Sequence, residues 1–166
     1  HLDRILEARG YIAHEPVTTM TKPVMTKVKA PASVEQAEAP SEGWIETDTG
    51  VISASRKQLA PKLVARVPEP RAFFSCVRDG RVISAGLGAM KNGFAVVECM
   101  ATREDARRSG GALAILAGIE GWAAAKGAHT LFLQAVTANA PAIGLYRAAG
   151  YRAVMQNHYR VLGTPT

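Results

Sequence analysis

The sequence predicts an α/β (α+β) fold: a mixed, mostly antiparallel sheet flanked by helices, with an N-terminal appendage. Two hairpin signals, Asp79-Gly80 and Asn92-Gly93, separate three apolar runs that suit strands. A fourth such run at 130–136 follows a long apolar helical segment. Because a strand–helix–strand connection favours parallel pairing, the sheet should be mixed rather than purely antiparallel.

The elements expected within residues 71–166 follow the order β-β-β-α-β-α-β, with strands at 72–78, 81–90, 94–101, 130–136 and 151–162 and the longer helix at 110–126. This helix is apolar almost all round, so it should be buried against the sheet. Gly127 is placed to end it. The short second helix is capped by Asn139, accepts Pro141 in its first turn and ends at Gly150.

Residues 1–70 are less regular. We expect a helix at 2–9 stopped by Gly10, loose extended segments at 11–28, and a linker or exposed loop at 30–43. The stretch 44–51 is ambiguous, and a helix at 55–67 should be kinked or restarted at Pro61. The first helix ends in Ala-Arg-Gly-Tyr, which echoes Ala-Ala-Gly-Tyr at 148–151. That echo is consistent with the tail of an earlier copy of the same fold. Since the chain starts with His1, we expect it to begin inside a longer protein.

The net charge of +6 lies in the C-terminal part of the chain. Residues 1–70 hold nine Lys or Arg and nine Asp or Glu, whereas residues 71–166 hold eleven and five. A cationic region favours an anionic ligand, which leaves a nucleic acid and a phosphorylated cofactor open beside a plainly solvated basic surface. Aromatic residues make up only 6% of the chain and no recognition helix is evident, so nucleic acid ranks last.

Several other classes of protein do not fit the pattern. The most apolar stretch, 112–125, contains Glu120 and is shorter than a membrane span needs, so no membrane partner is expected. Two cysteines, Cys76 and Cys99, suit a reducing cytoplasm and read as small buried hydrophobes. No Cys/His spacing suggests a metal, and no Gly-Lys-Ser/Thr phosphate loop occurs.

The segment 107–112, Arg-Arg-Ser-Gly-Gly-Ala, leaves a strand and enters the long helix. Glycines let the backbone approach a ligand closely. The first N–H groups of a helix have no internal partner and lie at the positive end of its dipole, so they suit a pyrophosphate. From this segment alone, a pyrophosphate loop and an ordinary basic loop remain equally open.

This segment resembles the pyrophosphate loop of the GNAT acetyltransferases, Arg/Gln-x-x-Gly-x-Gly/Ala, which is matched by Arg107, Gly110 and Ala112. Further agreement with the family comes from Asn139, Ala142, Leu145-Tyr146 and Gly150-Tyr151. The resemblance covers about residues 71–162. Residues 1–70 look like the remnant of a degenerate first GNAT-like half, as in two-lobed members of the family.

The resemblance implies an enzyme, an N-acetyltransferase that moves an acetyl group from acetyl-coenzyme A to a primary amine by direct attack, without a metal. The expected cofactor-binding residues are Met100, Ala101, Thr102, Arg107, Arg108, Ser109, Gly110, Gly111, Ala112 and Asn139. A gap between strand 94–101 and strand 130–136 would expose the backbone of the first three to the pantetheine arm and to the oxyanion. The role of Asn139 as a helix cap is an equally simple reading.

The same resemblance implies two catalytic residues. Tyr146 matches the general acid: a phenol with an ordinary pKa of about 10 is protonated at neutral pH and can donate to a leaving thiolate. Glu98 is the only acidic residue of the three-strand meander outside its turns. Strand alternation predicts that Glu98 shares a face with Val96 and Met100, where apolar surroundings would raise its pKa and suit a general base. The alternatives are a packing role for Tyr146 and, for Glu98, an exposed edge residue or a substrate-binding charge.

Two other functions remain open: a non-catalytic coenzyme A-binding regulatory module and, ranked below it, a basic nucleic-acid-binding domain. The acceptor is open between a small-molecule amine and a protein amine. The sequence is also compatible with a homodimer.

Overall fold

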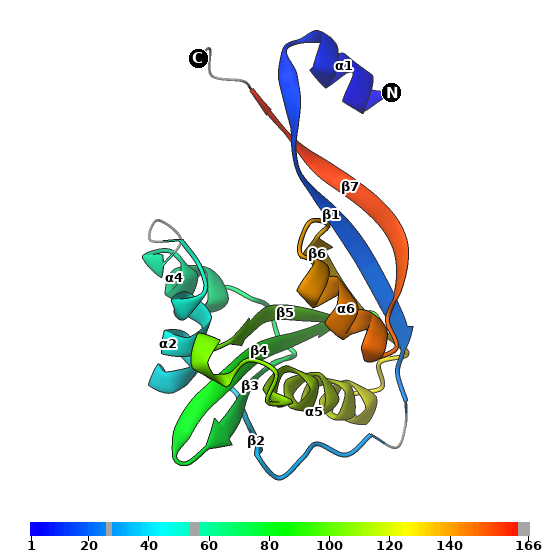
Figure 1. The fold of residues 1–166 in the computed structure, drawn as a ribbon. Coiled ribbons are helices and arrows are strands. Elements are labelled where there is room, and N and C mark those ends of the chain that lie inside the picture. The colour runs from blue at the N-terminus through cyan, green and yellow to red at the C-terminus, as the bar shows by residue number, and fades with distance from the viewer. Residues whose placement is uncertain (26–27, 54–56, 163–166) are drawn as a thin grey trace. The chain divides into compact units, whose positions relative to one another are not determined.

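The computed structural model describes residues 1–25, 28–53 and 57–162, and over these residues the sheet has seven strands in the order β2-β3-β4-β5-β6-β1-β7 (Figure 1). Its strands are β1 (Tyr11–Pro23), β2 (Val34–Ala37), β3 (Arg71–Arg78), β4 (Arg81–Lys91), β5 (Phe94–Thr102), β6 (Thr130–Val136) and β7 (Arg152–Leu162). Its helices are α1 (Leu2–Ala8), α2 (Glu42–Gly50), α4 (Ala60–Val64), η1 (Glu104–Ala106), α5 (Gly111–Ala125) and α6 (Ala140–Ala148). The predicted fold class, a mixed and mostly antiparallel sheet flanked by helices, is confirmed.

The chain divides into two compact units. The larger unit comprises Lys22–Phe132, and the smaller unit combines residues 1–21 with those from Leu133 onwards. Strand β6 contributes residues to both units.

The larger unit is built on the predicted three-strand meander. Asp79 and Gly80 have φ values of 50° and 73°, and Asn92 and Gly93 have 52° and 80°. Two consecutive left-handed residues are the signature of a two-residue hairpin whose twist matches that of its strands. Both hairpins are therefore confirmed, and they join β3 to β4 and β4 to β5 with antiparallel register.

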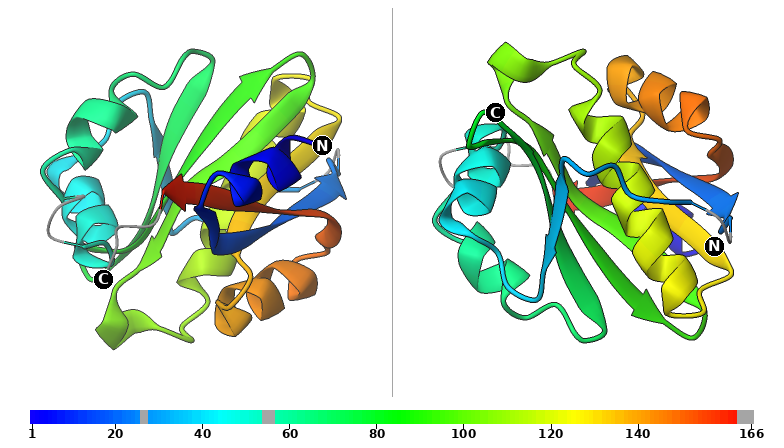
Figure 2. Two further views of the ribbon diagram at one scale, coloured as in Figure 1. Left: turned by 90° about the horizontal axis from the view of Figure 1, so that it is seen from above. Right: turned by 90° about the horizontal axis from the view of Figure 1, so that it is seen from below.

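Helix α5 covers one face of this meander (Figure 2). It packs so closely on β4 that two strand positions have no room for a side chain. A Cβ at Gly86 would overlap Ile115 Cγ2, and a Cβ at Gly88 would lie 3.0 Å from the Trp122 ring. The prediction that the apolar helix is buried against the sheet is confirmed.

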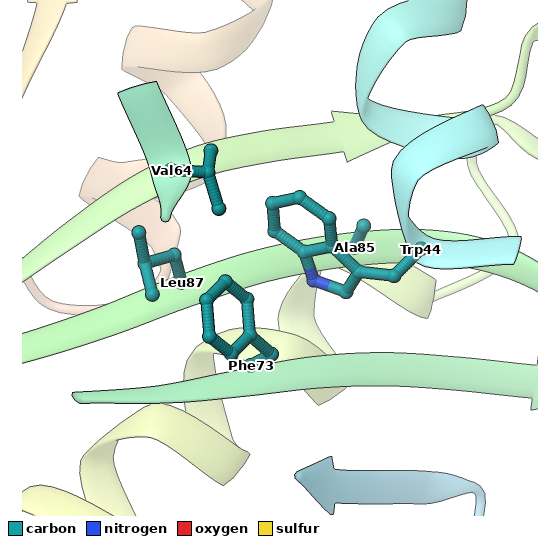
Figure 3. Packing of buried hydrophobic residues seen from close by; sticks show 5 residues of the cluster. All are labelled: Trp44, Val64, Phe73, Ala85 and Leu87. Carbon is teal, nitrogen blue, oxygen red and sulfur yellow. The ribbon is translucent and has the colours of Figure 1, made fainter. Parts of the chain in front are cut away.

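The opposite face of the meander carries a second apolar layer beneath α2 and α4. Five buried side chains meet there (Figure 3): Trp44, Val64, Phe73, Ala85 and Leu87. The Trp44 ring meets the Phe73 ring edge-on at 5.3 Å, and Trp44 Nε1 donates to the Gly86 carbonyl at 3.0 Å. This hydrogen bond satisfies the one polar group of the indole and fixes α2 over β4.

Glu120, which interrupts the apolar run of α5, is buried but paired. Its carboxylate accepts from Lys22 Nζ at 2.7 Å and from the Met25 N–H at 3.0 Å. None of the described helices is both long and apolar enough to cross a membrane.

The N-terminal residues contain more regular structure than their composition indicates. The stretch 30–43, expected to be a linker, contains β2, which pairs antiparallel with β3. Three of the four β2 residues are exposed, so this edge strand lacks the apolar alternation that would have revealed it. The ambiguous stretch after it forms α2, capped by Ser41, whose hydroxyl accepts from the Trp44 N–H at 3.2 Å. Part of the helix expected at 55–67 lies outside the described residues, and α4 occupies 60–64.

In the smaller unit, β1 and β7 pair antiparallel from Tyr11 opposite Leu162 to Thr21 opposite Arg152. Helix α1 is tied to β7 through Asp3, whose carboxylate accepts from Arg160 Nε at 2.7 Å and contacts His158 Nε2 at 2.8 Å. These hydrogen bonds hold the pKa of Asp3 well below its usual range. Gly10 ends α1 with a φ of 82°, as predicted.

The close packing of α5 on β4 predicts the effect of a single methyl group. Gly86→Ala should destabilise the protein by about 1–3 kcal/mol, because its Cβ overlaps Ile115 in a filled core. Gly50→Ala is the control, since a Cβ there meets nothing within 4 Å and alanine is the better helix former. Urea unfolding followed by circular dichroism measures both. Equal stabilities for the two variants would contradict the packing described.

Candidate functional site

Helix α5 begins with backbone N–H groups that take no part in the hydrogen bonds within the helix. Its first hydrogen bond runs from the Ala114 N–H to the Gly110 carbonyl at 3.0 Å. The N–H groups of Gly111, Ala112 and Leu113 precede that bond. Among the described residues, no hydrogen bond engages any N–H from 108 to 113. A 15-residue helix therefore presents unengaged donors at the positive end of its dipole.

The loop before α5 turns through two left-handed residues, Arg108 with a φ of 60° and Gly110 with a φ of 86°. Ser109 Oγ donates to the Ala106 carbonyl at 2.6 Å, and Arg78 Nη2 donates to the Ser109 carbonyl at 3.1 Å. These bonds use the hydroxyl and the carbonyls of the loop. They therefore fix its shape and leave its amides without a hydrogen-bond partner among the described residues.

Gly111 brings the first turn of α5 against the sheet. A Cβ on Gly111 would overlap the hydroxyl of Ser84, which is fully buried in β4. Ser84 Oγ also shares a 2.9 Å hydrogen bond with Thr102 Oγ1, at the end of β5. The helix start, β4 and the end of β5 are thus held together by direct contacts of Ser84.

The two arginines of the loop are exposed. Arg107 Nη1 lies 3.7 Å from Glu104 Oε1, and both side chains are largely in solvent, where such a pair is weak. Arg108 has no side-chain hydrogen bond or ion pair with any described residue. Both guanidinium groups can therefore turn toward an anion at the helix start.

Strand β5 carries a β-bulge that the sequence analysis did not anticipate. Ala101 stands opposite Ala85, and Glu98 stands opposite Leu87. Two residues of β5, Cys99 and Met100, therefore face the single residue Gly86, and Cys99 has a φ of 52°. Bulges of this kind redirect side chains and often lie beside active sites.

The bulge corrects one prediction. Glu98 lies opposite Leu87 and therefore on the α2 face of the sheet, and Cys99 packs against the apolar cluster on that face. Met100 does not share this face: its sulfur lies 2.9 Å from where a Cβ of Gly86 would be, toward α5. The extra residue reverses the alternation after Glu98, so the expected face shared by Glu98 and Met100 is wrong.

The pairing of β5 with β6 is short. The parallel ladder joins Phe94, Ala95 and Val96 to Thr130, Leu131 and Phe132, while β5 itself continues to Thr102. Met100, Ala101 and Thr102, the predicted contacts of the pantetheine arm, all lie beyond the last pair. The end of the ladder agrees with the gap that this role requires.

Three ionisable groups near the bulge have raised pKa values. Burial raises the pKa of Cys99 to about 12, and the charges of Asp48 and Glu98 add to that increase. Burial also raises the pKa of Asp48 and of Glu98. The direction of this shift is the one expected of a general base, while the Glu98 side chain as a whole is exposed to solvent.

The smaller unit holds the other predicted residues. Tyr146, in α6, is buried, and its ring meets that of Tyr151 at 6.0 Å. Asn139 Oδ1 accepts from the Ala142 N–H at 3.2 Å, so Asn139 caps α6 as its position in the sequence predicted. Its role toward a cofactor stays a prediction.

Sequence reasoning missed the buried carboxylate of Asp48, because no motif marks position 48. It also missed an open cavity of about 830 Å³ in the larger unit, between the end of α2, the start of β4 and η1. Polar side chains line this cavity, among them Thr47, Thr49, Arg81, Arg103 and Arg107. No group of three or more metal-ligating side chains converges within the described ranges.

The structure is thus an α/β protein with a mixed sheet, a bulge in β5 and unengaged N–H groups at the start of α5. A family model described as the acetyltransferase (GNAT) family matches residues 33–151. The chain belongs to the GNAT acetyltransferase family.

One relative is YobR of Bacillus subtilis, an uncharacterized N-acetyltransferase that is 24% identical over 126 residues. The match covers 75% of this chain and 51% of YobR, so the chain spans about half the length of this curated relative.

Two solved structures show the same fold. A GNAT-family protein from Novosphingobium aromaticivorans is 23% identical with a TM-score of 0.69, and the match covers 95% of this chain and 69% of that one. A GCN5-related N-acetyltransferase from Kribbella flavida is 19% identical with a TM-score of 0.68, and the match covers 98% of this chain and 64% of that one.

The raised pKa of Cys99 in the bulge predicts that its thiol reacts slowly in the folded protein. In a Cys76→Ala variant, Cys99 should react with iodoacetamide at pH 8 at least about 100-fold more slowly in the folded protein than in urea, because a thiol with a pKa of about 12 holds almost no thiolate at that pH. The rate should climb only above pH 10. Equal rates in the folded and unfolded chains would show that the bulge leaves Cys99 open to solvent.

Proposed function

We propose that this chain forms the acyl-transfer part of an N-acetyltransferase that moves an acetyl group from acetyl-coenzyme A to a primary amine. The observation that carries the proposal is the set of unengaged N–H groups at the start of α5, beside two exposed arginines. Such a terminus suits a diphosphate. The end of the β5–β6 ladder and the bulge before Met100 support a thioester site next to it.

When bound, acetyl-coenzyme A supplies a thioester whose carbonyl carbon is the electrophile. N–H groups of 111–113, with Arg107 and Arg108, hold the diphosphate. Backbone groups of Met100, Ala101 and Thr102 orient the pantetheine arm, and an N–H among them stabilises the oxyanion. These assignments are part of the proposal and rest on the position of each residue beyond the last β5–β6 pair.

The chemical step needs one base and one acid. Glu98 takes a proton from the acceptor ammonium, for which its raised pKa is suited. The amine then attacks, the C–N bond forms and the C–S bond breaks. Tyr146 donates a proton to the departing thiolate and regains one from solvent, and the nitrogen, which carries two protons after the attack, releases one to solvent to give the neutral amide. Cys99 is not a covalent carrier in this scheme, because its thiol stays protonated near neutral pH.

The N-terminal residues support a further part of the proposal, that residues 1–70 derive from a degenerate first GNAT-like half. The order helix, glycine, tyrosine, strand occurs twice in the smaller unit: α1, Gly10, Tyr11 and β1, then α6, Gly150, Tyr151 and β7. Both glycines are left-handed, with φ values of 82° and 93°, and the two strands pair with each other.

Gly110 provides the sharpest test of the binding site. Gly110→Ala should weaken coenzyme A binding at least about tenfold, because a side chain at a φ of 86° strains the turn that presents the amides. Gly127→Ala is a matched control at the other end of α5: its φ is 80°, and a Cβ at either position meets nothing within 4 Å. Calorimetry measures binding and thermal melting measures strain. Equal losses of affinity in both variants would contradict the proposed site.

Tyr146→Phe should lower kcat by about 10²–10⁴-fold with little change in coenzyme A affinity, because it removes only the proton that the thiolate needs. Amine-dependent thiol release over an amine panel measures kcat. An unchanged rate would reject the acid role. Coenzyme A binding without thiol release from the unaltered chain, whichever amine is supplied, would instead support a non-catalytic coenzyme A-binding module.

A further inference from the structure

The open cavity of about 830 Å³ in the larger unit is lined mainly by charged and hydroxyl-bearing side chains. Cavities that take small molecules have volumes of roughly 300–1,000 Å³ and are usually lined by apolar groups. This cavity therefore has the volume of a ligand site and the lining of a site for a charged ligand. Among the described residues, four cationic side chains line it against three carboxylates: Lys57, Arg81, Arg103 and Arg107 against Glu46, Glu104 and Asp105. The excess of positive charge favours an anion.

The ion pairs of the cavity leave hydrogen-bond donors unused. Arg81 donates to Asp105 Oδ2 at 2.7 Å and Arg103 donates to Glu46 Oε1 at 3.0 Å, in both cases through Nη1. The other guanidinium nitrogens of these two arginines form no hydrogen bond with any described residue. A guanidinium presents five N–H donors in a fork that fits a carboxylate. Each arginine can therefore bind a second anionic group.

The Arg103–Glu46 pair is unequal in its exposure. Only 23% of the Arg103 side chain is exposed, against 66% of the Glu46 side chain. The cation thus lies in the wall of the cavity, while its counter-ion lies largely in water, where such a pair is weak. A carboxylate held inside the cavity would interact with Arg103 in less polar surroundings and therefore more strongly. A ligand can thus replace Glu46 on Arg103.

The cavity adjoins residues to which the proposed function assigns the co-substrate. Arg103 directly follows Thr102, which is proposed to hold the pantetheine arm, and its N–H donates to the Ile83 carbonyl in β4 at 3.0 Å. Arg107, which also lines the cavity, belongs to the loop before α5. A molecule in the cavity would therefore lie beside the proposed site of the co-substrate, where the acceptor of the acetyl group has to be.

A purely structural explanation is available for these arginines. The two hydrogen-bonded pairs tie η1 and the end of β5 to β4 and α2, and this is a role in itself. In that case the loss of Arg103 and the loss of Glu46 would have the same effect, because each breaks the same contact. The structural and functional explanations therefore differ in what the two partners of one ion pair do when each is replaced alone.

We propose that this cavity binds a carboxylate of the acceptor, so that the substrate class is a primary amine that also carries a carboxylate, as amino acids do. This inference rests on the proposed function and names its substrate class. Arg81 and Arg103 bind the carboxylate through the nitrogens that their ion pairs leave unused, and Glu46 gives up its place on Arg103. The amine of the acceptor attacks the thioester, and the bonds that form and break are those of the proposed transfer.

Matched probes of equal shape test the carboxylate site. We would compare unbranched ω-amino acids, from glycine to 6-aminohexanoate, each with its own carboxamide, in a thiol-release assay with acetyl-coenzyme A. The unaltered chain should prefer at least one amino acid over its carboxamide by at least about tenfold in kcat/KM. Arg103→Gln should raise KM for that amino acid at least about tenfold, and should change KM for the carboxamide and both kcat values less than about threefold.

Glu46→Gln is the matched control, because it breaks the same ion pair and keeps the cation. It should leave KM for the amino acid unchanged or lower it, since it removes the carboxylate that competes for Arg103. Equal increases of this KM in both variants would reduce the pair to a structural tie and overturn the carboxylate site. Arg81→Gln, at a half-exposed side chain, is the second variant if thermal melting shows that Arg103→Gln folds poorly. It should raise the same KM at least about threefold.

A binding measurement separates this inference from the proposed function. In calorimetry without acetyl-coenzyme A, at least one amino acid of the panel should bind the unaltered chain at least about tenfold more tightly than it binds Arg103→Gln. If the chain releases no thiol but shows this difference, the acyl-transfer function fails and the carboxylate site stands. If thiol is released but neither assay distinguishes any amino acid from its carboxamide, the function stands and the carboxylate site is overturned.

Coenzyme A itself is the rival occupant of the cavity, because its phosphates are also anions. Calorimetry with coenzyme A decides between the two. Arg103→Gln should change its affinity less than about threefold if the cavity takes the acceptor. A loss of at least about tenfold in coenzyme A affinity, with KM for the amino acid unchanged, would assign the cavity to the co-substrate and overturn the inference.

Discussion

The close contact between helix α5 and strand β4 is the constraint on which the rest of the larger unit depends. Glycines at 86 and 88 remove the side chains that would separate the two elements, and Gly111 lets the first turn of the helix meet Ser84 directly. Because Ser84 also bonds Thr102, the helix start is held at the end of β5. The apolar packing along α5 thus positions its open amides, and the loop uses its hydroxyl and carbonyls to keep its own shape.

The β-bulge on β5 decides which face of the sheet the side chains of this strand occupy. One extra residue sends Met100 to the α5 face, while Glu98 stays on the α2 face near Asp48 and Cys99. A regular strand would have placed Glu98 and Met100 together. The bulge therefore separates the apolar contact with α5 from the acidic groups beneath α2, and it lies just before the residues that we propose hold the pantetheine arm. It also leaves Cys99 only partly buried, but desolvated enough that its thiol stays protonated, which favours direct transfer over a covalent intermediate.

Local signals predicted the meander well, because Asp79-Gly80 and Asn92-Gly93 specify hairpins whatever surrounds them. The apolar run of α5 and the caps at Asn139 and Gly127 were predicted equally well from local sequence. Strand β2 was missed because its residues are exposed and polar at a sheet edge. The bulge was missed because nothing in Glu98-Cys99-Met100 marks an insertion until the register against β4 is known. Asp48 was missed for a related reason: a lone aspartate in a short helix becomes informative only once its burial is seen.

The central claim is that the N–H groups at the start of α5 bind a diphosphate, and amide NMR tests it residue by residue. Coenzyme A should shift the amide resonances of Gly111, Ala112 and Leu113, whereas pantetheine, which lacks the diphosphate, should leave them in place. Shifts from coenzyme A that spare these three amides and appear elsewhere would contradict the account.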